Sequence, residues 1–163
     1  APALRLGYLV APWSVLNQMI ACKGGGTGAL EQMVVADFMQ NQYEAHVDGL
    51  KERLKAKRDV LIEALEANFG AAAEFGVPPG GIYLWIKLPP EVDTLQLADA
   101  ALKQGVAFNP GPQWSVDPDA ARSHLRICFA NPSEQALRDG VARLAQICFE
   151  ETGIPPRSAN VSR

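Results

Sequence analysis

Histidine, cysteine and long apolar runs are all scarce in this chain of 163 residues. The two histidines, His46 and His124, stand far apart, so the sequence predicts neither a histidine-based metal cluster nor an acid–base pair of histidines. The three cysteines, Cys22, Cys128 and Cys148, are odd in number and widely separated in apolar contexts. They indicate buried, reduced thiols rather than a disulfide framework or a zinc site. We therefore expect no metal site.

No apolar stretch approaches the roughly 18 residues that would span a bilayer, and the N-terminus lacks the charged-then-apolar layout of a secretory signal. Lys and Arg total 15 against 18 Asp and Glu, a net charge of -3, and the two signs are mixed along the chain. No run of like charge could follow a nucleic-acid backbone or an anionic membrane. No serine stands in a Gly-x-Ser-x-Gly context, which argues against a hydrolase. We expect a cytoplasmic protein with no membrane or nucleic-acid partner for this segment.

The chain is 48% hydrophobic and 20% charged, so it can bury a substantial core in one domain, or in one domain with an appendage. Apolar periodicity and turn residues predict helices over residues 13–21, 29–41, 45–68, 94–104 and 131–151. They predict strands over residues 4–11, 82–88, 106–109 and 123–130. This order of elements indicates an α/β (α+β) chain rather than a bundle or a sandwich.

Polar and glycine residues predict where several helices begin and end. Asp93 is suited to cap the helix that follows it, and Gly105 to stop that helix. Asn131 is the predicted cap of the last helix, with Pro132 in its first position. The glycine-rich residues 24–28 follow a helix and lack a Gly-Lys-Ser/Thr ending, so they indicate a flexible connector rather than a phosphate loop.

The predicted elements also suggest a division of the chain. Residues 1–42 hold a single strand, which cannot form a stable sheet alone, so they are expected to be a remnant of a larger domain. Residues 43–152 hold the other predicted strands and are expected to form a separate domain. Residues 153–163 are expected to be a flexible tail.

Two arginines occupy positions where ordinary packing would not place them. Arg5 shares one face of its predicted strand with Gly7, which leaves room for a guanidinium to point into a cleft and bind phosphate oxygens. A solvated arginine on an edge strand is the alternative. Arg126 shares a strand face with Cys128 and Ala130, both small, and a half-buried guanidinium needs a carboxylate or phosphate partner. A structural ion pair with Asp or Glu is the alternative there.

Four segments, two of which contain these arginines, occur in an order that resembles class I/II, fold type I, pyridoxal-phosphate-dependent aminotransferases. They are residues 2–12, 79–85, 105–111 and 125–130. The closest resemblance is to the branch with 2-aminoadipate and kynurenine-type aminotransferases, and it extends from residue 2 to about residue 150. Four landmarks in order are more specific than any one of them. The resemblance implies that residues 43–152 form the small C-terminal domain of this fold, a sheet of about three or four strands with helices on one side.

The resemblance implies a role for each arginine. Arg5 matches the family arginine that holds the cofactor phosphate, and Arg126 matches the arginine that binds the substrate α-carboxylate, roles that suit a planar, bidentate donor. The family's Schiff-base lysine lies a few residues before the strand with Arg5, hence upstream of Ala1 and outside this chain. The resemblance therefore implies a truncated protein without catalytic residues of its own and inactive alone.

For the complete protein the resemblance implies transfer of an amino group between amino acids and 2-oxo acids, with pyridoxal 5'-phosphate as cofactor and a homodimeric assembly. The cofactor is expected to bind this part of the chain weakly or not at all. Two alternatives stay open. The chain is also compatible with the effector-binding, aminotransferase-like domain of a GntR-type transcription regulator, and with an unrelated α/β interaction domain whose arginines are surface charges.

Overall fold

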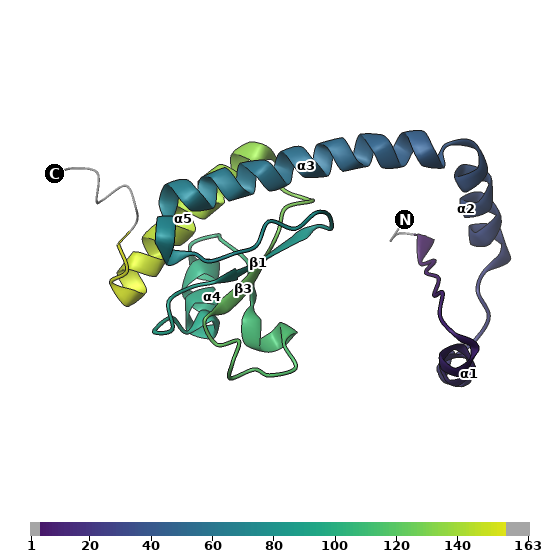
Figure 1. Ribbon diagram of the computed structural model, residues 1–163, viewed down its shortest axis with the longest axis horizontal. Coiled ribbons are helices and arrows are strands. Elements are labelled where there is room, and N and C mark those ends of the chain that lie inside the picture. Colours follow the sequence, from purple (N-terminus) through teal and green to yellow (C-terminus); the bar gives the residue numbers. More distant parts are fainter. Residues whose placement is uncertain (1–3, 156–163) are drawn as a thin grey trace. The chain divides into compact units, whose positions relative to one another are not determined.

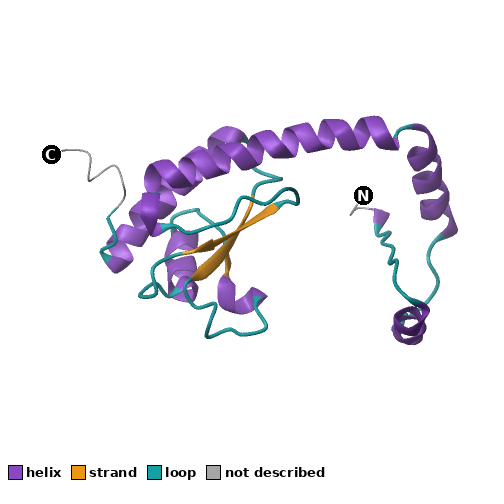
Figure 2. Cartoon of the chain, in the orientation of Figure 1, coloured by secondary structure: helices purple, strands orange, loops and turns teal. Residues whose placement is uncertain are grey.

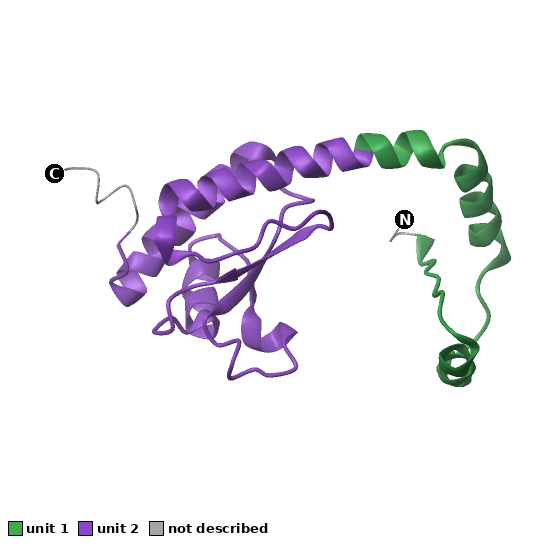
Figure 3. Cartoon of the chain, viewed as in Figure 1, with its two compact units in different colours: residues 1–49 green, residues 50–163 purple. Residues whose placement is uncertain are grey.

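The computed structural model describes residues 4–155. By internal contacts the chain divides into two units, residues 1–49 and 50–163 (Figure 3), and each is described by itself. Its helices are α1 (Trp13–Cys22), α2 (Ala29–Asn41), α3 (Tyr43–Asn68), α4 (Thr94–Lys103) and α5 (Glu134–Thr152), with short 3-10 helices η2 (Gly70–Ala72) and η3 (Gly111–Trp114) (Figure 2). Its strands are β1 (Tyr83–Lys87), β2 (Asn109–Pro110) and β3 (His124–Cys128).

The strand predicted over residues 4–11 is absent, and this prediction was wrong. Leu4 and Arg5 form a turn, and an irregular segment follows as far as Pro12. A strand satisfies its backbone N–H and C=O groups only by pairing with a neighbour. No other strand is present among the described residues of the first unit, so the Leu-Arg-Leu-Gly-Tyr segment has nothing to pair with.

The two helices of the first unit begin and end close to the predicted residues but bury nothing. Neither α1 nor α2 contains a buried residue. Large apolar side chains such as Trp13, Leu30 and Met33 are exposed instead. Cys22 is exposed as well, so the expectation of three buried thiols holds for Cys148 but not for Cys22, although the three thiols are free. The first unit therefore has secondary structure without a core of its own.

The second unit has a continuous apolar core to which its helices and strands contribute. Helix α3 buries Val60, Leu61, Ala64 and Leu65, which lie on one helical face. Helix α5 buries a similar stripe, namely Leu137, Val141, Leu144, Ala145, Ile147 and Cys148. These residues form one cluster with buried side chains of α4 and of the sheet. Each Å² of apolar surface that is removed from water contributes about 25 cal/mol to stability. The cluster is therefore the main source of stability in the unit.

The sheet is antiparallel, with strand order β1-β3-β2; β1 and β3 are labelled in Figure 1. Along β1, the buried Leu84 and Ile86 alternate with the exposed Tyr83, Trp85 and Lys87. Side chains of a strand point alternately to its two faces, so one face of the sheet meets the core and the other lacks such cover. This small antiparallel sheet, with helices packed on one face, confirms the predicted fold. The predicted strand at residues 106–109 is reduced to Asn109–Pro110.

The helix ends agree with the sequence at α4 but not at α5. The Asp93 carboxylate accepts hydrogen bonds from the backbone N–H groups at the start of α4, and Gly105 follows the helix with a φ of 78°. The cap of α5 is Ser133, whose Oγ accepts from the N–H of Ala136 at 3.1 Å, and not Asn131 as predicted. Gly153 ends α5 in the left-handed conformation. Most of the predicted tail, residues 156–163, lies outside the described residues.

Across residues 4–155, the structure contains no helix with both the length and the apolar character that crossing a membrane would require.

Candidate functional site

The uncovered face of the sheet gathers aromatic and cationic side chains. Register pairing sets Trp85 on β1 directly opposite Arg126 on β3, and Lys87 opposite His124. Asn109 on β2 pairs with Arg126 from the other side. Because directly opposite residues share a face, the pairing brings these side chains together away from the core. This face is the candidate site of the second unit.

The guanidinium of Arg126 contacts two aromatic rings. Its Cζ is 3.9 Å from the ring centroid of Tyr83 and 3.6 Å from that of Trp114. Tyr83 belongs to β1, whereas Trp114 belongs to η3, which directly follows β2. Since β3 lies between β1 and β2, Tyr83 reaches Arg126 from one neighbouring strand, and Trp114 reaches it from the 3-10 helix that follows the other. Each contact is a cation–π interaction, typically about 0.5–2 kcal/mol depending on exposure.

Arg126 carries its charge without an anionic partner in the described part of the chain. Its Nε is buried and has no hydrogen-bond partner, and the carboxylates near the sheet pair with other cations, Glu74 with Lys87 and Asp93 with Arg122. An unsatisfied buried donor costs about 1–3 kcal/mol. Within residues 4–155, the structural ion pair considered as the alternative for Arg126 is not found. The guanidinium is therefore available to an external anion.

His124 extends the same face. Its ring stacks on Trp85 with centroids 5.6 Å apart and an interplanar angle of 23°. Its Nδ1 is buried without a partner. Burial lowers the pKa of His124 below its ordinary value, the charge of Lys87 lowers it further, and Glu74 opposes both effects. Burial thus favours a neutral imidazole beside the cationic Arg126.

Arg5 lies in the first unit and has a different environment. It is exposed and adopts a φ of 53°, a left-handed conformation that non-glycine residues rarely take. Gly7, which was expected to make room beside it, has open space around its Cα. Arg5 and Arg126 belong to different units, and each is described within its own.

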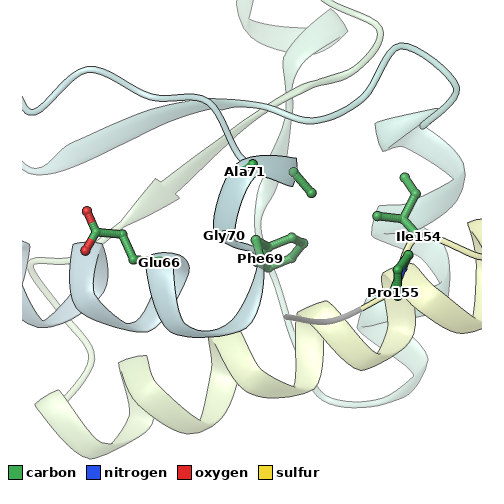
Figure 4. Close-up of a pocket in the computed structure, with 7 residues that line it drawn as sticks. Glu66, Phe69, Gly70, Ala71, Ile154 and Pro155 are labelled. Carbon is green, nitrogen blue, oxygen red and sulfur yellow. The ribbon is translucent and has the colours of Figure 1, made fainter. Parts of the chain in front are cut away.

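Other hollows of the second unit do not involve Arg126. One, at the C-terminal end of α3, is lined mainly by Phe69, Gly70, Ala71, Ile154 and Pro155, with Glu66 as the single charged side chain (Figure 4). Another lies between α3 and the turn at residues 79–81 and carries cationic side chains, of which Lys55 and Arg58 both pair with Asp59. No group of three His, Cys, Asp or Glu residues that could hold a metal ion occurs within residues 4–155.

The sequence pattern identifies Arg126 as a candidate binding residue, but it does not identify Tyr83, Trp114 or His124 as its neighbours. Alternation along the strands already placed Tyr83 and Trp85 on one face, and His124 and Arg126 on one face. The missing information was the pairing of β1 with β3, which joins segments about 40 residues apart, and the return of η3 over β3.

The chain matches the family model for aminotransferase class I and II over residues 1–144. It belongs to this family. A crystal structure of LysN, the α-aminoadipate aminotransferase of Thermus thermophilus, complexed with N-(5'-phosphopyridoxyl)-L-leucine, superposes with a TM-score of 0.77 and 25% identity, covering 90% of this chain and 38% of that chain. The predicted resemblance to the 2-aminoadipate branch of fold type I aminotransferases is therefore confirmed.

Relatives of this aminotransferase-family chain have two kinds of name. An uncharacterized aminotransferase of Saccharolobus solfataricus is 30% identical over 155 residues, which are 93% of this chain and 38% of that protein. The HTH-type transcriptional regulator YdfD of Bacillus subtilis is 30% identical over 154 residues, 92% of this chain and 31% of the regulator. The chain thus spans about a third of the length of the curated relatives that it matches.

Membership of the family implies pyridoxal phosphate, but the residues that the structure describes form no enclosed site around Arg5 that would hold it. The resemblance assigns Arg5 to the phosphate, and that side chain lies in an open turn without an enclosing cradle. Several lysines are engaged elsewhere: Lys23 with Thr27, Lys55 with Asp59, Lys57 with the carbonyl of Ala130 and Lys87 with Glu74. No chemical step through the cofactor is derived from these residues.

Proposed function

We propose that this chain is the C-terminal part of an aminotransferase that moves an amino group from an amino acid to a 2-oxo acid, with Arg126 as the binding group for the substrate α-carboxylate. One observation carries the proposal: a guanidinium in contact with Tyr83 and Trp114 on the sheet face away from the core, without an anionic partner among residues 4–155. A carboxylate offers two coplanar oxygens to the donors of a guanidinium, which is the pairing arginine favours.

The remainder of the site is proposed from family membership. Arg5 would bind the phosphate of pyridoxal 5'-phosphate, a cofactor that acts as an electron sink at the carbon bearing the amino group. The lysine that binds the cofactor covalently would lie upstream of Ala1. Residues 1–42 would belong to the large cofactor-binding domain and residues 43–152 to the small domain. The 163-residue chain alone would bind the cofactor weakly and show no turnover.

A homodimeric parent protein is part of the proposal. Helices α1 and α2 bury no residue, and exposed side chains such as Trp13 and Leu30 need cover from further protein surface. The rest of the large domain and a second subunit would together supply it. Light scattering coupled to size exclusion of the parent protein would measure a dimer; a monomer at micromolar concentration would contradict this part.

Kinetics of the parent protein test the carboxylate role. Arg126→Gln removes the charge, and we expect the KM for amino acid and 2-oxo acid to rise about tenfold or more, which corresponds to at least about 1.4 kcal/mol of lost binding. Arg138→Gln is the matched control, because Arg138 is an exposed residue of α5 paired with Glu63. Unchanged KM values in Arg126→Gln would reject the assignment of Arg126 to the substrate carboxylate. Turnover by the 163-residue chain alone would reject the proposal that this chain is inactive by itself.

A regulator is the second candidate, favoured by the match to YdfD, of which this chain covers 31%. In that case the same arginine would recognise the carboxylate of an effector rather than of a substrate. A parent protein that binds pyridoxal phosphate and DNA, but forms no 2-oxo acid from any of the twenty amino acids, would establish the regulator. Product formation with steady-state turnover would establish the enzyme.

A further inference from the structure

We propose that Trp114 and Tyr83 are positioning residues for the carboxylate site: their rings contact the guanidinium of Arg126 and hold it in place, so that a ligand meets it only at its edge. The inference rests on the proposed function of Arg126 and adds two residues to it. Trp114 is the more informative of the two, because it comes from a short 3-10 helix outside the sheet.

The distances show how closely the rings cover the guanidinium. Separations of 3.9 and 3.6 Å between Cζ and the ring centroids are van der Waals contacts. No ligand atom fits between either ring and the guanidinium carbon. The donors of the group point outward in its own plane, so they stay accessible only along the edge.

The burial of Nε reduces the number of Arg126 donors that a ligand can reach. Because Nε is shielded from solvent and has no partner, the two terminal nitrogens are the donors left for a ligand. Two parallel N–H groups at one end of a guanidinium suit a carboxylate that approaches in the same plane. The rings thus select one direction of approach, whereas a solvated arginine would sample many rotamers and lose more entropy on binding.

The position of Trp114 is itself fixed by close packing. It ends η3, whose first residue, Gly111, has its backbone against the carbonyl oxygens of Ala121 and His124. Trp114 remains 53% exposed, so its ring contributes little to the core while it covers Arg126. An exposed tryptophan on a sheet-side turn, stacked on an unpaired cation, is better explained by control of that cation than by core packing.

Four variants separate positioning from a general structural role. Trp114→Leu removes the ring, and Trp114→Phe keeps an aromatic face. Trp85→Leu removes a ring of the same kind from the same face, but Trp85 stacks on His124 and not on Arg126. Tyr83→Leu supplies a second test from β1 if the change at Trp114 prevents folding.

The first measurement uses the 163-residue chain without ligand and follows hydrogen exchange of the Arg126 Nε–H by NMR. We expect Trp114→Leu to accelerate this exchange about tenfold or more, since the ring shields the atom, while Trp114→Phe and Trp85→Leu leave it near wild type. Backbone amides of α5 serve as the internal check of folding. Unchanged exchange in both Trp114→Leu and Tyr83→Leu would overturn the proposal.

The second measurement uses steady-state kinetics of the parent protein. Trp114→Leu is expected to raise the KM for the amino acid about tenfold with little change in kcat, because binding of the carboxylate is weakened equally in ground state and transition state. A fall in kcat at constant KM would overturn the positioning role. Failure of Arg126→Gln to affect KM would reject the carboxylate site itself, whereas the exchange experiment on Arg126 would still report whether the rings hold it.

Discussion

Gly111 approaches His124 so closely that a Cβ at position 111 would lie 2.5 Å from the carbonyl oxygen of His124. The same Cβ would lie 2.4 Å from the carbonyl oxygen of Ala121. Both neighbours are backbone atoms, which cannot move away as the end of a flexible side chain could. The start of η3 can therefore lie against β3 only because residue 111 has no side chain.

We predict that Gly111→Ala destabilises the second unit by about 1–3 kcal/mol, the usual cost of forcing an extra carbon into a packed site. The shift of η3 should also move Trp114 away from Arg126. Urea denaturation followed by circular dichroism measures the free energy of unfolding, and tryptophan fluorescence reports the change around Trp114.

Gly140→Ala is the matched control for this substitution. Gly140 lies inside α5, and a Cβ there meets no atom within 4 Å. Replacing a helical glycine by alanine in open space stabilises a protein by about 0.5–1 kcal/mol. Equal changes in stability for the variants at positions 111 and 140 would show that the close approach of Gly111 is not responsible.

A second prediction concerns the start of α5. Ser133→Ala removes the side-chain oxygen that accepts the N–H of Ala136, and should cost about 0.5–2 kcal/mol of stability. Asn131→Ala, two residues earlier, should change stability by less than about 0.5 kcal/mol, because Asn131 is exposed and outside the helix. Thermal denaturation of both variants provides the test. A larger loss of stability for Asn131→Ala than for Ser133→Ala would show that Asn131 is the cap, as the sequence predicted.

Asn131 and Ser133 show a limit of predicting a helix start from local sequence patterns. Both residues are good caps, and the sequence places them two positions apart, so helix propensity alone cannot choose. The packing of α5 decides, because burial of Leu137 and Val141 fixes which face turns inward. Helices α3 and α4 were predictable to within about two residues since their apolar stripes and glycine stops are local features.

Long-range pairing explains the features for which local sequence patterns are insufficient. The segment at residues 4–11 has the composition of a strand, but a strand requires a partner, and none lies among the described residues of the first unit. Arg126 could be singled out because alternation separates it from its apolar neighbours. Its contact with Trp114 depends on how the chain returns after β2, which no spacing in the sequence encodes.

The third prediction uses the pKa of His124, which burial and then Lys87 lower below the ordinary value of 6.5. Unfolding restores the ordinary value, so the unfolded chain takes up a proton at a higher pH than the folded one. The contribution of His124 to the free energy of unfolding is therefore fully present above pH 6.5 and decreases as the pH falls below that value. Urea denaturation at pH 7.5 and 5.5 should show a smaller loss for His124→Gln than for wild type, and an NMR titration of the ring should give a pKa under 6.5. Identical pH dependence in the two proteins would contradict a lowered pKa of His124 in the folded chain.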